Sequence, residues 1–86
     1  MGRNREVIEP LQEYLRRAPG RPIDHFNLGV CLREAGRTSE SLDSFRRALE
    51  LESTAPPWLG AFLELLRNEG LAFEAREWEQ RFTSER

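Results

Sequence analysis

A repeat of 34 residues constrains the fold of this chain more than any other feature of its sequence. When the sequence is shifted by 34 residues against itself, identical residues align at Leu32 and Leu66, Arg33 and Arg67, Gly36 and Gly70, Glu40 and Glu74, and Arg47 and Arg81. The same shift pairs Leu11 with Phe45, Leu15 with Leu49, and Leu28 with Phe62. A period of this length is typical of stacked units of supersecondary structure. The 86 residues therefore predict one small domain, residues 1–86, built from copies of one unit.

Glycine and proline divide the chain into segments of helical length. They leave five segments of about 12 to 15 residues, and they stand at Pro19-Gly20, Pro22, Gly36, Pro56-Pro57 and Gly70. Strands need β-branched residues, yet valine and isoleucine each occur only twice, while Leu, Glu, Arg and Ala fill most positions. The sequence therefore predicts an all-α fold of five helices.

Capping residues indicate where successive helices of the chain meet. Gly36 is placed to end one helix in the left-handed conformation, and Thr38 is expected to be the N-cap of the next. Such a short connection makes the two helices antiparallel neighbours. Gly70 is expected to end another helix, and a last helix is expected from Leu71 to about Thr83.

Prolines complicate two of the expected helix starts. Ser53 or Thr54 is expected to cap a helix whose first turn contains residues 56–57, since proline is tolerated there. Pro10 would interrupt the first helix, because an interior proline costs about 3 kcal/mol. That helix is therefore expected to begin late, near Glu6.

Two neighbouring segments differ in how their apolar residues are distributed. The segment from Pro22 to Ala35 has a wide apolar arc, made by Ile23, Phe26, Leu28, Val30, Cys31 and Leu32. The next segment has a single stripe, made by Leu42, Phe45, Ala48 and Leu49. We expect the first helix to be sandwiched between two others and the second to be covered on one side only.

The segment from Pro22 to Ala55 contains a characteristic set of residues, which are Leu28-Gly29, Leu32, Gly36, Phe45 and Ala48, with the ending Ala48-Leu49-Glu50-Leu51-Glu52. Through these residues the segment resembles the tetratricopeptide repeat family. The resemblance implies an α-solenoid of antiparallel helix hairpins, in which the glycine and the small residue let paired helices cross closely. The departures are His25, Leu32, Ser41 and Ser53, which stand at an aromatic, a tyrosine, an alanine and a proline position of the family.

This resemblance divides the chain into about two and a half repeats. Residues 1–21 would be the second helix of a partial repeat, residues 22–55 a full repeat, and residues 56–86 a degenerate C-terminal repeat. The last repeat is degenerate because Leu63 stands at the glycine position and Phe82 at an alanine position.

The resemblance also implies a function, which is to bind a protein. In this family the first helices of successive repeats line a concave groove that holds peptide segments. The residues transferred to that groove by position are Ile23, Phe26, Val30, Arg33, Glu64 and Arg67. We therefore expect a non-enzymatic adaptor or scaffold that binds a protein or peptide partner, with Phe26 as its main anchor.

An alternative function is self-assembly. Two and a half repeats are fewer than the three or so that usually give a stable stack. An unpaired end helix could gain apolar burial by pairing with a second copy. Otherwise the chain would be a piece of a longer repeat array, in which missing neighbours would cover Val7, Leu11 and Tyr14 of the first helix or Trp78 and Phe82 of the last. The alternative is therefore a structural module that forms a homodimer or a higher oligomer.

Composition argues against other partners and against catalysis. The thirteen basic residues are all arginines, and fifteen acidic residues balance them to a net charge of −2. We expect no nucleic acid, membrane or small-molecule substrate as partner, and no metal or cofactor. Lone His25 has no nucleophile at a recognisable spacing, and Cys31 lies on the apolar arc, so we expect no enzyme. One cysteine favours a reducing, cytoplasmic compartment, and arginine without lysine favours a bacterial source with GC-rich genes.

Overall fold

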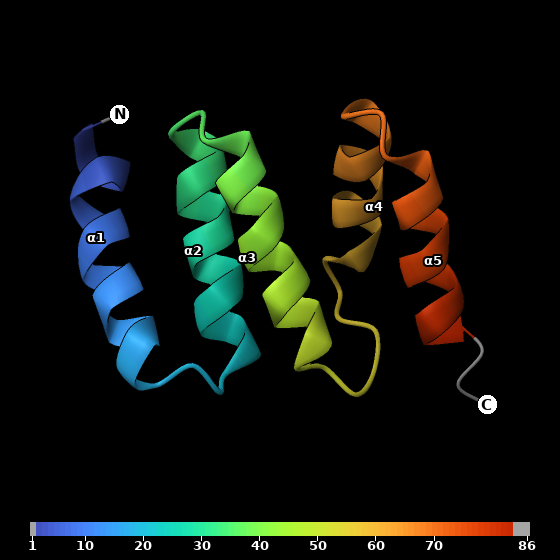
Figure 1. The fold of residues 1–86 in the computed structure, drawn as a ribbon, viewed down its shortest axis with the longest axis horizontal. Helices are drawn as coiled ribbons and strands as arrows, with labels where there is room; N and C mark the ends of the chain where they lie inside the picture. Colours follow the sequence, from blue (N-terminus) through green and yellow to red (C-terminus); the bar gives the residue numbers. More distant parts are fainter. Residues whose placement is uncertain (1, 84–86) are drawn as a thin grey trace. The chain divides into compact units, whose positions relative to one another are not determined.

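The computed structural model describes residues 2–83, with side chains from residue 6 onward, as five α-helices (Figure 1). The helices are α1 (Gly2–Arg17), α2 (Pro22–Glu34), α3 (Thr38–Glu50), α4 (Leu59–Asn68) and α5 (Ala72–Thr83). No strand occurs among the described residues. The structure confirms the all-α prediction of five helices arranged as hairpins. None of the helices found in residues 2–83 is long and apolar enough to cross a membrane.

The chain forms two compact units, which are Met1–Glu52 and Ser53–Arg86. The first unit contains α1, α2 and α3, and the second contains α4 and α5. The division falls just before Pro56, where the sequence predicted the start of the last repeat.

Helix α2 is the centre of the first unit, because it packs against both α1 and α3 (Figure 1). Between α1 and α2 the buried residues are Ile8, Leu15, Leu28 and Leu32, with Leu11 and Cys31 partly buried against them. This contact confirms that the helix with the wide apolar arc is sandwiched. Cys31 packs there as a small apolar side chain.

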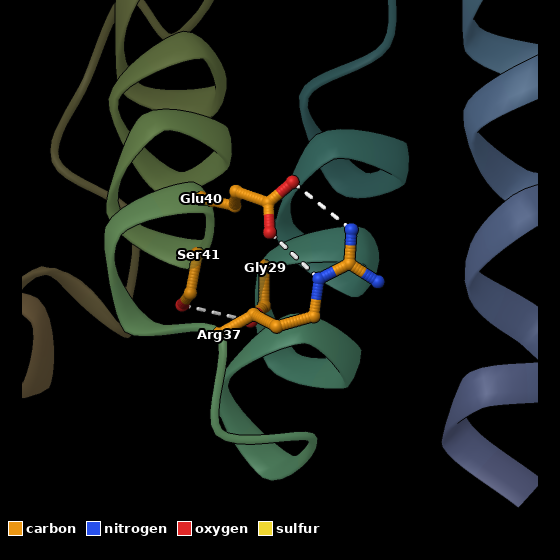
Figure 2. A network of polar contacts seen from close by, with 4 residues as sticks. All are labelled: Gly29, Arg37, Glu40 and Ser41. Carbon is orange, nitrogen blue, oxygen red and sulfur yellow. Dashed lines mark hydrogen bonds and ion pairs between the residues drawn. The ribbon is translucent and has the colours of Figure 1, made fainter.

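Helices α2 and α3 approach each other closely at Gly29. A Cβ atom built on Gly29 would lie 2.6 Å from Cε1 of Phe45, so only glycine fits beside that ring. The fully buried Ser41 hydroxyl donates a hydrogen bond of 2.9 Å to the backbone carbonyl of Gly29, as Figure 2 shows. Ala48 is also fully buried in α3. The close crossing predicted from the small residues is confirmed, and a serine adds a polar tie to it.

The two hairpins turn in the same way. In the first, the Arg37 N–H donates to the Leu32 carbonyl at 2.9 Å and the Gly36 N–H donates to the Arg33 carbonyl at 3.0 Å. In the second, 34 residues later, Leu71 N–H donates to the Leu66 carbonyl at 2.8 Å and Gly70 N–H to the Arg67 carbonyl at 3.1 Å. Gly36 and Gly70 have φ angles of 81° and 78°. Both are Schellman motifs, and they confirm the predicted glycine helix ends.

The second unit is a hairpin with a small interior. Its buried residues are Pro56, Phe62, Leu63, Leu66 and Ala75. Trp58 packs edge-on against Phe62, with ring centroids 6.3 Å apart, before α4 begins. On α5, Trp78 stacks on Phe82 and its indole N–H donates to Glu74 at 2.9 Å. Trp78 and Phe82 are only half-buried, so Ala75 is the one buried side chain of α5 within its described range.

The predicted starts of α1, α3 and α4 are wrong. Helix α1 begins at Gly2 and contains Pro10 in its interior. Both Pro10 and Glu6 are exposed, so the carbonyl of Glu6, which Pro10 leaves without an N–H donor, is open to water. Thr38 is the first helical residue of α3, and Arg37 is the N-cap, without a side-chain cap bond.

The start of α4 also differs from the prediction. Residues 53–57 precede the helix, which begins only at Leu59. The Leu59 N–H donates to the carbonyl of Pro56 at 3.1 Å, so a turn over Pro56 to Leu59 leads into the helix. Neither Ser53 nor Thr54 is placed to cap it, because the N-cap position belongs to Trp58.

Candidate partner-binding surface

Four of the predicted binding residues lie on one face of α2. Because Pro22 starts this helix, Ile23, Phe26, Val30 and Arg33 follow at helical spacings of three and four residues, which place them side by side. We call these four residues the α2 stripe. Ile23 is 48% exposed, Phe26 and Val30 are half-buried, and Arg33 is exposed.

Phe26 is held in place by α3. Its ring centroid lies 5.7 Å from that of Phe45, with the ring planes tilted by 47°. The contact covers part of Phe26 and fixes its orientation, which limits the rotamer entropy that binding would cost. Ile23 is therefore the more exposed apolar side chain of the stripe, although the sequence favoured Phe26 as the anchor.

The other two predicted residues, Glu64 and Arg67, lie one turn apart on α4 in the second unit, and both are exposed. Arg67 reaches Oε1 of Glu79 on α5 at 3.8 Å. Arg33 and Arg67 occupy equivalent places, because the carbonyl of each accepts the bond from the glycine of its turn. An exposed ion pair of this kind contributes little stability, so Arg67 keeps donors for a ligand.

His25 has a structural role in the first unit. It is buried, and its Nε2–H donates a 2.8 Å hydrogen bond to the carbonyl of Pro19, which ties the connection between α1 and α2 to the start of α2. The described residues hold no group of three histidines, cysteines or acids that could bind a metal ion.

One polar cluster was missed by sequence reasoning. At the start of α3, Arg37 grips both carboxylate oxygens of Glu40, with Nε to Oε1 at 2.6 Å and the terminal nitrogen to Oε2 at 3.0 Å (Figure 2). This hydrogen bond lowers the pKa of Glu40 and raises that of Arg37. Thr38 does not cap α3, and this pair fixes its first turn instead. The signal was present as an Arg–Glu spacing of three residues directly after Gly36.

A second missed feature is an open cleft in the first unit, which Arg16 and Arg47 line from different helices. No spacing in the sequence joins these two residues, because α1 and α3 are separated by all of α2.

Comparisons with protein-family models, with curated proteins and with solved structures each found no match to this chain.

Proposed function

We propose that this protein is a non-enzymatic interaction module of the tetratricopeptide type, which binds a segment of a protein partner on the α2 stripe. The observation that carries the proposal is the exposure of Ile23 on a helix whose other sides are covered. α2 packs against α1 and α3, and yet 48% of Ile23 remains open beside Val30. The repeated glycine turn, at the 34-residue period, supports the assignment to this repeat type.

The stripe has the composition of a small binding surface. Ile23 and Val30 supply apolar area, the oriented ring of Phe26 adds an aromatic edge, and Arg33 supplies a charged group at one end. Burying these apolar side chains would drive association, while Arg33 would fix the direction of an acidic partner segment. Glu64 and Arg67 of the second unit are proposed as partner-binding residues in their own right, with opposite charges that select polar residues of a protein segment.

The experiment is photo-crosslinking followed by affinity measurement. A photoreactive residue at position 23 should capture a partner in host extract, while the same residue at the exposed position 76 of α5 should not. Calorimetry with the purified partner then compares the wild type with Ile23→Ser and with the control Arg76→Ser. We expect Ile23→Ser to weaken binding by about tenfold, the effect of losing one interface anchor. Equal affinity of both variants for the partner would remove the α2 stripe from the proposal.

Self-assembly is a second candidate, favoured by the exposed apolar residues of the terminal helices. On α1, Val7 is 46% and Tyr14 43% exposed, two turns apart on one face, and on α5 Phe73 is 74% exposed. Burying such side chains against a second copy would contribute about 1.5 to 3 kcal/mol each if they became fully covered. Sedimentation equilibrium tests this candidate, because a dimer that Tyr14→Glu dissociates would favour it and a monomer at all concentrations would exclude it.

A further inference from the structure

The first unit contains a cleft that is separate from the α2 stripe. It lies where the end of α1, the start of α2 and the end of α3 meet, and its volume is about 720 Å³, within the range of ligand sites. Leu15 and Arg16 come from α1, Leu28 from α2, and Arg47 and Leu51 from the end of α3. Leu28 packs toward α1 in the core, on the side of α2 away from Val30.

Two arginines and no acidic residue line the cleft. Arg16 and Arg47 face it from two different helices, and no carboxylate is among its lining residues. Each arginine is paired with an acid of its own helix that lies outside the lining, Arg16 with Glu13 at 2.7 Å and Arg47 with Glu50 at 3.8 Å. Both pairs are largely exposed, so they contribute little and leave several guanidinium N–H donors for a ligand.

The rest of the lining combines the polar Gln12 and His25 with apolar residues from α1, α2 and the end of α3. Leu15 and Leu28 are buried core residues, which fixes their positions. Leu51 follows the last turn of α3 and remains 41% exposed. The Nε2–H of His25 donates to the carbonyl of Pro19, and this bond holds the connecting turn, whose residues Pro19 and Gly20 line the cleft. An exposed leucine beside two cations favours a ligand that combines aliphatic side chains with carboxylates.

We propose that this cleft binds an extended protein segment in which acidic and aliphatic residues alternate. The acidic side chains would pair with Arg16 and Arg47 by charge-assisted hydrogen bonds, and the aliphatic side chains would cover Leu51. This site goes beyond the proposed function, since none of its residues belongs to the α2 stripe. The chain would thereby hold two protein segments on two sides of α2.

The test uses the full chain and a short fluorescein-labelled peptide of repeated Leu-Glu dipeptides. We expect saturable binding by fluorescence anisotropy, with amide chemical-shift changes at Gly20 and Leu51. The double variant Arg16→Gln, Arg47→Gln should weaken binding by about tenfold or more, because two charge-assisted contacts are lost. Both arginines are exposed, so these substitutions preserve the fold, which circular dichroism verifies.

Two controls decide the outcome. The variant Arg17→Gln, Arg76→Gln removes the same charge from exposed positions outside the cleft, and it should leave the affinity nearly unchanged. If both double variants weakened binding equally, the binding would be due to non-specific charge attraction, and the proposal would be overturned. Binding of dodecanoate without binding of the peptide would also overturn it, because the cleft would then be a site for a fatty acid. A peptide in which glutamine replaces glutamate should not bind.

Discussion

The two hairpins, α2–α3 and α4–α5, have the same turn but opposite interiors. In the first hairpin, Gly29 lies against the ring of Phe45, and the larger side chain belongs to the second helix. The equivalent positions in the second hairpin, 34 residues later, are Leu63 and Glu79. Leu63 is buried, whereas Glu79 points outward to Arg67. The large buried side chain therefore belongs to the second helix in the first hairpin and to the first helix in the second hairpin.

The same contrast appears one turn away. Ser41, which ties α3 to the Gly29 carbonyl, corresponds to Ala75, which has no hydroxyl to donate. Among the described residues, α3 buries Ser41, Leu42, Ser44, Phe45, Ala48 and Leu49, and α5 buries only Ala75. The comparison teaches that turn chemistry is enough to specify a hairpin. The close crossing of its helices needs a separate pattern of small and large residues.

The largest expected difference between the hairpins is at Phe45. Phe45→Ala should cost about 3–5 kcal/mol of the stability of the first unit, because it leaves a cavity against Gly29. The matched change in the second hairpin, Glu79→Ala, removes only an exposed ion pair and should cost less than about 1 kcal/mol. Urea unfolding by circular dichroism measures both. Tryptophan fluorescence reports the second unit separately, since Trp58 and Trp78 both lie there. Equal losses would show that the two interiors are alike.

A leucine at position 29 would give the first hairpin the residue of the second. Gly29→Leu should destabilise the first unit by about 1–3 kcal/mol through overpacking, because its Cβ would overlap the Phe45 ring. The loss should be smaller in the Phe45→Ala background, where the ring is absent, and a double-mutant cycle measures that coupling. Gly60→Ala is the control. Its Cβ meets nothing within 4 Å, so it should gain about 0.5–1 kcal/mol. If the costs of Gly29→Leu and Phe45→Ala were additive, the close contact between the two positions would be contradicted.

The turns should respond identically. Gly36→Ala and Gly70→Ala should each cost about 1–2 kcal/mol, since an L-residue is strained at the positive φ of both positions. Gly20→Ala serves as control, because Gly20 is outside the positive-φ glycines of the described chain and should show no such cost. Thermal unfolding compares the three, and a large difference between Gly36→Ala and Gly70→Ala would break the equivalence of the turns.

The polar tie between α2 and α3 should have a smaller effect. Ser41→Ala makes this position like Ala75, and it should cost about 0.5–1.5 kcal/mol, the value of one hydrogen bond. Ser39→Ala changes an exposed residue of the same helix and should be nearly neutral. Hydrogen exchange of the α3 amides measures both, and the hypothesis fails if Ser39→Ala is the more damaging.

The smallest effect concerns pH. Because the Arg37 hydrogen bond lowers the folded-state pKa of Glu40, the pair stabilises the chain above the ordinary Glu40 pKa of 4.5, and this contribution is lost as the pH falls through the lowered value. Arg37→Met should return the Glu40 pKa toward 4.5, as an NMR titration of its carboxyl carbon would report. Arg17→Met should leave it unchanged. The second hairpin has Leu71 at the position of Arg37, so it cannot form the same arginine–glutamate pair.

Sequence reasoning predicted what depends on local chemistry. Gly36 and Gly70 end their helices because only glycine takes a positive φ at little cost. Position 29 requires glycine because the ring of Phe45 lies against it. The start of α1 was wrong because the cost of Pro10 was given too much weight. The repeat itself indicated an earlier start, since Asn4 aligns with Thr38, the first residue of α3, at the 34-residue shift.

The candidate surfaces show the same limit. The family resemblance was enough to group the residues of the α2 stripe on one face, although it could not say that Phe26 rests on Phe45. The cleft was beyond prediction, because Arg16 and Arg47 come together only when three helices pack. Periodicity describes one helix at a time, and it carries no information about gaps between helices.

The empty space around Gly36 and Gly70 has a stereochemical consequence. A Cβ at either position would meet no atom within 4 Å, so the backbone angle alone excludes alanine there. D-alanine prefers the mirror-image angles, and it should therefore fit both turns and strengthen them by restricting the unfolded chain. The two turns therefore discriminate between the mirror images of one small residue through the backbone angle alone.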